Sequence, residues 1–91
     1  RMRLRFFASF RDVVGTNELT WTQPTTTLGA LVDDLCARYG PGFSKWMFEG
    51  DEIAAWIIIL VNGKDYRDIG GASITLHPED VLCFFPPVAG G

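Results

Sequence analysis

Apolar and polar residues alternate at the start of the chain, which is the pattern of a β-strand with one buried face. A turn or a single helical turn is expected over residues 12–17, and alternation resumes over residues 18–22, where Leu19 and Trp21 are apolar. The two segments predict a hairpin that ends at Pro24. The apolar positions of the first strand are Leu4, Phe6, Ala8 and Phe10, and they alternate with Arg3, Arg5, Phe7 and Ser9.

The next segment has the period of a helix. Its apolar residues are spaced i, i+3, i+4, i+7, i+8 and i+11, so that they form one stripe. Thr26 or Thr27 is expected to supply the N-cap oxygen, Gly40 to follow the last turn, and Pro41 to prevent continuation. The stripe consists of Leu28, Leu31, Val32, Leu35, Cys36 and Tyr39, with Asp33 and Asp34 on the solvent side.

The second half of the chain predicts further strands. Residues 42–52 are expected to form a loop with a short helix around residues 43–48, in which residues 46–48 make a satellite apolar cluster. The continuous apolar run 56–61 fits a strand that is covered on both faces or central in the sheet. Asn62 and Gly63 predict a hairpin turn before a short strand at 64–67 and a loop at 68–72. An extended segment at 74–76, a turn at 77–80 and a closing strand at 81–85 follow.

The order β-β-α-β-β-β predicts a two-layer α+β domain, with a mixed sheet packed on one main helix. The helical connection can place the first and last strands side by side and parallel, as in the β-grasp (ubiquitin-like) fold. We expect residues 1–91 to form one such domain, with residues 86–91 as a flexible, extended C-terminal tail.

Strand parity then predicts an uncovered face. If Leu82 and Phe84 point to the core, Phe85 shares the open face with Val81 and Cys83. Phe7 points the same way from the first strand, so two aromatic side chains would meet near the start of the tail. An apolar patch rimmed by Arg5 and Arg11 has the composition of a protein interface.

Composition narrows the functional classes. Eleven acidic and eight basic residues give a net charge of −3, and the bases are scattered, which argues against direct nucleic-acid binding. The longest apolar run, Ile53 to Val61, is too short to span a bilayer. No secretory signal pattern is present, and we therefore expect a cytoplasmic protein that does not bind membranes. Cys36 and Cys83 have no metal-ligand spacing, so packing roles are expected and no metal site is predicted.

The sequence contains no recognisable catalytic constellation. The single histidine, His77, lies in a turn before a proline, and no serine has a base at a familiar spacing. The glycines lack the spacing and setting of a phosphate-binding loop, so no bound cofactor is expected. We therefore expect a carrier or substrate protein that is not an enzyme by itself.

The segment after the closing strand is the chemically distinctive one. Pro86 and Pro87 cannot donate to a sheet ladder and hold the chain extended, whereas Gly90 and Gly91 can enter a slot too narrow for other residues. The segment 88–91 reaches roughly 13 Å at ~3.3 Å per residue. Such a tail could deliver the carboxylate of Gly91 into a partner's active site, through contacts made by Pro86, Pro87, Val88, Ala89 and Gly90.

Residues 4–15 together with 84–91 resemble the molybdopterin synthase sulfur-carrier subunit (MoaD/ThiS-like) family and the related small archaeal modifier proteins. The likeness extends to the helix after residues 24–26 and to residues 61–63. It implies a β-grasp domain whose Gly91 is adenylated by an E1-like adenylyltransferase that uses ATP, and is then converted to a thiocarboxylate. In molybdopterin (molybdenum cofactor) synthesis, the tail would enter the large catalytic subunit and donate sulfur. The resemblance also implies that Phe7, Arg11 and Phe85 contact these partners.

Several functions stay open at this point. The leading hypothesis is a sulfur carrier for molybdenum cofactor, and thiamine synthesis or tRNA thiolation would use the same tail. A protein modifier joined to its targets through Gly91 is the second hypothesis. An electron-transfer β-grasp protein would need four cluster thiolates, which two cysteines cannot supply. A plain interaction domain would not need Gly90 and Gly91 at all.

Overall fold

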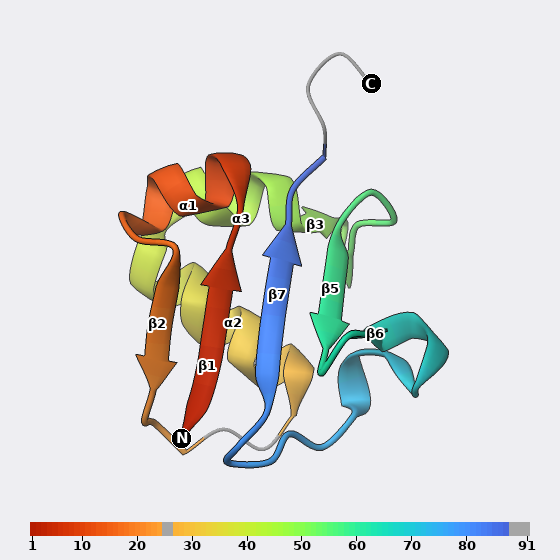
Figure 1. Ribbon diagram of the computed structural model, residues 1–91. Helices are drawn as coiled ribbons and strands as arrows, with labels where there is room; N and C mark the ends of the chain where they lie inside the picture. Colours follow the sequence, from red (N-terminus) through yellow and green to blue (C-terminus); the bar gives the residue numbers. More distant parts are fainter. Residues whose placement is uncertain (25–26, 88–91) are drawn as a thin grey trace.

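A computed structural model describes residues 1–24 and 27–87 of the chain. Its centre is a five-stranded mixed sheet with the order β2-β1-β7-β5-β6 (Figure 1). The strands are β1 (Met2–Phe6), β2 (Glu18–Trp21), β5 (Ile58–Val61), β6 (Lys64–Asp65) and β7 (Val81–Phe85). A separate two-stranded hairpin is formed by β3 (Phe48–Glu49) and β4 (Glu52–Ile53).

The first and last strands lie side by side in the middle of the sheet. Strands β1 and β7 are parallel, with Leu4 opposite Leu82 and Phe6 opposite Phe84, whereas β2 and β5 pair with them in the antiparallel sense. Asn62 and Gly63 have φ values of 51° and 85°, the left-handed conformation that a two-residue hairpin requires, and they join β5 to β6. These features confirm the predicted parallel pair and the predicted turn.

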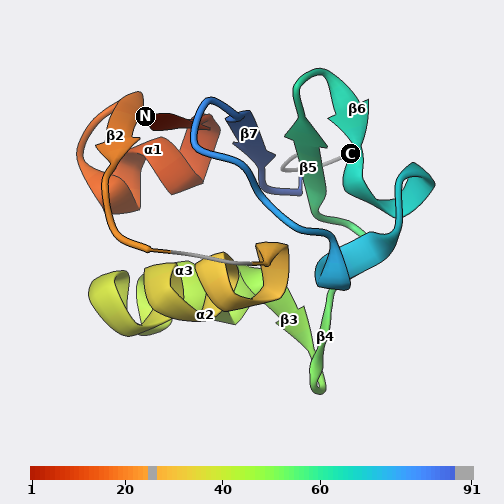
Figure 2. The same cartoon turned by 90° about the horizontal axis from the view of Figure 1, so that it is seen from below.

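The helices pack on one face of the sheet (Figure 2). The main helix is α2 (Leu28–Tyr39), capped by Thr27, whose hydroxyl accepts a hydrogen bond from the amide of Ala30 at 3.2 Å. Gly40 ends it with a φ of 72°, and α3 (Pro41–Met47) begins at the proline. A short helix α1 (Ala8–Val14) and two 3-10 helices, η1 (Tyr66–Asp68) and η2 (Gly71–Ser73), complete the described elements.

One apolar core lies between the sheet and the helices. The strands contribute alternate residues and α2 contributes the predicted stripe, in which Leu28, Leu31 and Leu35 are inaccessible to solvent. Phe43 of α3 joins the two layers because its ring contacts those of Phe6 and Phe10. The arrangement is the α+β, β-grasp architecture expected from the sequence, with a mixed sheet on one main helix.

The first predicted strand was too long. Strand β1 ends at Phe6, and residues 8–14 form α1 where alternation had suggested further strand and then a turn. Ala8 is exposed and has a φ of 51°, so it does not continue the core face. Phe10 is buried, but from a helix, because Phe10, Val13 and Val14 follow the i, i+3, i+4 spacing.

The predicted strand 56–61 was also too long. It lies inside the sheet, between β7 and β6, as one of its two predicted settings required, but it is not covered on both faces. Strand β5 begins at Ile58, which is 42% exposed, whereas Ile57 and Ile59 are fully buried. The predicted strand 64–67 is likewise shortened, because η1 starts at Tyr66. The predicted short helix around residues 43–48 is confirmed as α3, whereas the rest of the predicted loop contains the β3–β4 hairpin. Met47 of the expected satellite cluster belongs to the main core.

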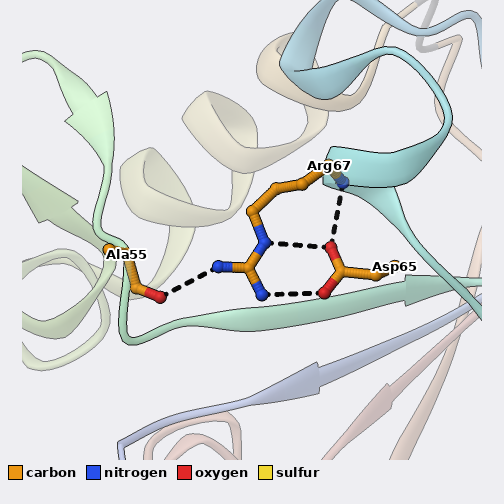
Figure 3. A network of polar contacts seen from close by, with 3 residues as sticks. All are labelled: Ala55, Asp65 and Arg67. Atoms are coloured by element: carbon orange, nitrogen blue, oxygen red, sulfur yellow. Dashed lines mark hydrogen bonds and ion pairs between the residues drawn. The ribbon is translucent and has the colours of Figure 1, made fainter.

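Hydrogen bonds of the Arg67 side chain connect the edge of the sheet to the turn before β5 (Figure 3). Its Nε and Nη2 donate to the two carboxylate oxygens of Asp65 at 3.0 and 2.7 Å, and its Nη1 donates to the carbonyl oxygen of Ala55 at 3.1 Å. Hydrogen bonds from the Arg67 side chain and amide lower the pKa of Asp65. This contact holds the turn at residues 54–57, and therefore the start of β5, against η1.

Candidate functional site

The candidate site lies where β1 and β7 end, at the same edge of the sheet (Figure 1). Phe7 and Phe85 are stacked there, with ring centroids 4.4 Å apart and planes inclined by 11°. The amide of Phe7 donates to the carbonyl oxygen of Phe84 at 3.2 Å, which continues the strand contact up to the start of α1. The predicted meeting of Phe7 and Phe85 is therefore confirmed, although both rings are half-buried because they cover each other.

An apolar groove of about 360 Å³ adjoins this stacked pair. The sharp turn at Ala8, where φ is positive, directs the chain from β1 into α1 and makes one wall. Ile58 forms part of another wall because it is the register partner of Phe85. The groove is lined by Phe7, Ala8, Ser9, Ile58, Phe85, Pro86 and Pro87.

Two arginines lie near the groove but in different settings. The guanidinium carbon of Arg5 is 5.7 Å from the centre of the Phe7 ring, and its Nε is 3.7 Å from a carboxylate oxygen of Glu18. Arg11 lies one helical turn after Phe7, is exposed, and has its Nε 3.9 Å from a carboxylate oxygen of Asp12. Both side chains are half or more exposed, so these ion pairs hold them only weakly and leave them available to a partner.

The open face extends further across the sheet than the sequence indicated. Leu60 and Cys83 are register partners on β5 and β7, and both are half-buried on the same side as Phe85. Ile58 and Leu60 were missed because a continuous apolar run does not reveal which residues face the core. Counting alternate residues back from the turn at Asn62 would have placed both of them on the open face.

The tail begins inside the site. Pro86 is buried and Pro87 is half-buried, and both line the groove. Pro86 is therefore packed against the domain, and the path away from the sheet starts after it. The predicted tail residues Val88, Ala89, Gly90 and Gly91 lie outside the described residues.

Two tryptophans, one on α3 and one in the turn before β5, are also exposed. Trp46 on α3 is 41% exposed and Trp56, in the turn before β5, is 44% exposed. The indole N–H of Trp56 donates to the carbonyl oxygen of Trp46 at 2.9 Å, and the Lys45 ammonium lies 5.4 Å from the centre of the Trp46 ring. The turn that carries Trp56 leads directly into Ile58 of the groove.

The other candidate reactive residues, a histidine and two cysteines, lie outside the groove. His77 is exposed in its turn, and Cys36 and Cys83 are half-buried free thiols, in agreement with their predicted packing roles. Burial, followed by the charge of Asp33, raises the pKa of Cys36 to about 11, so this thiol is protonated at neutral pH. Residues 1–24 and 27–87 contain no group of three or more histidines, cysteines and acids placed to hold a metal ion. Among the helices of these same segments, none has the length and apolar character needed to cross a bilayer.

Comparison with known proteins gives consistent matches over the whole chain. A family model described as the ThiS family matches residues 4–91. Small archaeal modifier protein 3 of Haloferax volcanii is 35% identical over 91 residues, which cover 99% of this chain and 98% of that protein. Sulfur carrier protein CysO of Mycobacterium tuberculosis is 34% identical over 68 residues, or 71% of this chain and 72% of that protein.

A solved structure agrees with these sequence matches. The solution structure of small archaeal modifier protein 1 from Methanosarcina acetivorans has a TM-score of 0.83 and 30% sequence identity, covering 99% of this chain and 95% of that chain. The names of these relatives describe carriers and modifiers, and none describes a catalyst. The family match covers every residue that lines the groove of the candidate site.

Proposed function

The chain belongs to the ThiS family of ubiquitin-like sulfur carriers and modifiers, and we propose that it carries sulfur on the C-terminal carboxylate of Gly91. The observation that carries this proposal is the position of the groove. An apolar surface with exposed cations lies at the point where β7 passes into the Pro-Pro segment. A partner that docks on Phe7, Phe85 and Ile58 is thereby placed beside the start of the tail.

The proposed chemistry uses a partner's active site. The carboxylate of Gly91 is ionised and unreactive at neutral pH, because α-carboxyl groups have a pKa near 3.5. An E1-like adenylyltransferase that uses ATP would join this carboxylate to AMP and release pyrophosphate. A sulfide-level sulfur donor would then attack the carbonyl carbon and displace AMP, which leaves a thiocarboxylate. The glycines contribute by keeping the reacting carbonyl free of side chains.

For the acceptor, we propose the molybdopterin precursor held by the large subunit of a molybdopterin-synthase-like enzyme. The support is the resemblance of residues 4–15 and 84–91 to the small subunit of that enzyme. In such a complex this chain is the small subunit and supplies sulfur. Phe7, Arg11 and Phe85 are proposed to contact both the activating enzyme and the large subunit.

The test is the mass of the chain after incubation with a cognate E1-like enzyme, ATP and a sulfide donor. The expected product is heavier by the difference between one sulfur and one oxygen atom, and the change must localise to the C-terminal peptide. The matched control is Gly91→Val, which alters the tail without touching the described core. A wild-type chain that acquires neither adenylate nor sulfur would refute the proposal.

A second function is favoured by the full-length match to a modifier protein. In this alternative a lysine amine of a target protein attacks the activated Gly91 carbonyl, displaces the leaving group and forms an isopeptide bond. Expression of a tagged chain in its native host would give a ladder of larger conjugates on a blot. Conjugates that persist after deletion of Gly91 would exclude this route.

A further inference from the structure

A second groove, of about 380 Å³, lies on the helical side of the molecule, between α2 and the β3–β4 hairpin. In Figure 2 the hairpin projects past α2, and the η1 and η2 segments lie beside the angle between them. This hairpin groove shares no lining residue with the groove at the start of the tail. It is lined by Gly29, Val32, Asp33, Phe48, Asp51, Glu52, Ile53, Tyr66 and Ala72.

The lining of the hairpin groove combines an apolar floor with one sign of charge. Val32, Phe48 and Ile53 supply apolar surface from α2, β3 and β4. All three ionisable side chains with formal charge in the lining are acids: Asp33, Asp51 and Glu52. They are exposed, and within residues 1–24 and 27–87 their carboxylates form no ion pair or side-chain hydrogen bond. An extended cation with an apolar stem fits these features.

Tyr66 provides the independent indication of a ligand. The residue lines the groove and is only 6% exposed, yet no hydrogen bond to its hydroxyl is formed by the described residues. Every fully enclosed side-chain nitrogen or oxygen in the described segments has a hydrogen-bond partner, so the Tyr66 hydroxyl is not fully enclosed. Burial raises the pKa of Tyr66, so the hydroxyl stays protonated and can both donate and accept.

The basic side chain next to Tyr66 already has hydrogen-bond partners of its own. Arg67 lies with its guanidinium carbon 5.9 Å from the centre of the Tyr66 ring, but its nitrogens are bound to Asp65 and to the carbonyl oxygen of Ala55 (Figure 3). Its charge is therefore already paired. The negative field of the three groove carboxylates is left for a ligand.

We propose that the hairpin groove binds an arginine side chain presented by a segment of a partner protein. Val32, Phe48 and Ile53 contact its aliphatic stem and the three carboxylates face its guanidinium. The Tyr66 hydroxyl accepts one N–H of that guanidinium. Arginine fits better than lysine because its guanidinium is planar, weakly hydrated and able to reach several acceptors at once. Since the two grooves have separate linings, this contact is independent of the proposed sulfur chemistry and is compatible with an occupied tail.

The test is a nuclear magnetic resonance titration of the full-length, isotope-labelled chain with a capped Gly-Arg-Gly tripeptide. The expected result is a set of amide shifts confined to the groove lining, with a dissociation constant in the millimolar range that is typical of a single side chain. The same peptide with citrulline is the neutral isostere, and a Gly-Lys-Gly peptide tests the head group. We expect at least tenfold weaker binding of the citrulline peptide, and weaker binding of the lysine peptide.

Three variants locate the contact. Asp51→Asn combined with Glu52→Gln removes two of the three charges and should weaken binding at least tenfold. Tyr66→Phe keeps the buried ring and should weaken binding at least about tenfold, the effect of one hydrogen bond to a charged group. Asp34→Asn is the matched control, because Asp34 is exposed on α2 but does not line the groove.

Several outcomes overturn the proposal. Equal affinity for the arginine and citrulline peptides would show that charge is not recognised, and equal affinity for lysine would remove the assignment to arginine. Shifts spread over all acidic surfaces, or a loss in Asp34→Asn equal to that of the double variant, would show a non-specific attraction. Tight binding of spermidine with no effect of the peptide would identify a polyamine site. None of these outcomes bears on whether Gly91 carries sulfur.

Discussion

Phe6, the last residue of β1, and Phe7, which follows it, point to opposite faces, which allows the interface to be separated from the core. Phe6 is 1% exposed and contacts both Phe43 and Phe84, whereas Phe7 is half-buried and stacked on Phe85. Replacing each by alanine removes the same atoms from adjacent positions of the chain. Phe6→Ala should cost about 3–5 kcal/mol of unfolding free energy, as for buried phenylalanines in general. A chain of 91 residues has a total of about 5–14 kcal/mol at 0.05–0.15 kcal/mol per residue.

Phe7→Ala should cost less, because Phe7 is only partly buried within the domain. Less than the usual burial energy of about 1.5–3 kcal/mol is lost, together with a stacking term of about 0.5–1.5 kcal/mol. The exposed part of the ring, at most about a third, is available to a partner. If binding buries that part, the variant should bind the activating enzyme about 2- to 5-fold more weakly, the equivalent of about 0.5–1 kcal/mol.

The assays are urea unfolding followed by tryptophan fluorescence, and calorimetric titration with the cognate E1-like enzyme at a temperature where both variants are folded. The reasoning is refuted if Phe7→Ala is destabilised as much as Phe6→Ala, or if a folded Phe7→Ala binds the enzyme with unchanged affinity. A folded Phe6→Ala with wild-type binding would support the separation of the two faces.

Three further predictions concern the tail, a buried carboxylate and a thiol. Gly91→Val should leave the melting temperature unchanged but abolish adenylation, measured as pyrophosphate release; a normal rate would contradict a narrow receiving site. Asp80→Ala should lower the free energy of unfolding, measured in urea, by about 2–4 kcal/mol. The Asp80 carboxylate accepts hydrogen bonds from Asn62 Nδ2 and from the His77 amide, both at 2.8 Å, and the variant leaves both donors without their acceptor. A loss below about 1 kcal/mol would show that water replaces the carboxylate. In Cys83→Ser, the remaining thiol, Cys36, should react slowly with iodoacetamide at pH 8 when folded and rapidly in urea, because its pKa is raised to about 11.

The raised pKa of Cys36 also sets a direction for alkaline stability. The folded state holds the thiol proton more tightly than the unfolded state, where the reference value is 9.0. The stabilisation from this group is therefore complete below pH 9 and is lost as the pH rises toward 11. Cys36→Ser should remove that part of the alkaline decline in melting temperature, and an unchanged decline would assign it to other groups.

Hydrophobic periodicity predicted the elements correctly where one face of an element is buried and the other faces solvent. The α2 stripe, its Thr27 cap, the β7 parity and the Asn62–Gly63 turn all agree with the structure. The periodicity gave the wrong element at Ala8. The apolar residues up to Phe10 fit both a longer strand and the first turn of a helix, and only the positive φ at Ala8 distinguishes the helix from the strand. The alanine gives no sequence signal for such an angle, since glycine is the usual residue there.

The site was predictable only in part. Phe7 and Phe85 followed from parity across two strands, whereas the position of Ile58 beside Phe85 depends on the register between β5 and β7, which the sequence does not contain. The hairpin groove was not foreseen either, because residues 42–52, which include Asp51 and Glu52, were predicted to form a loop with a short helix. Their position opposite α2 depends on the packing of β3–β4 and η1, elements too short to carry a period.

The central place of β7 has a consequence for how the protein is made. Until residues 81–85 have been synthesised, the strands on either side of them have no partner there, and the sheet cannot close. A nascent or truncated chain that ends before β7 would expose two unsatisfied edges and be prone to aggregation. A chain without β7 should therefore not fold, which provides a form of quality control: an activating enzyme that recognises the folded surface would not bind such a chain.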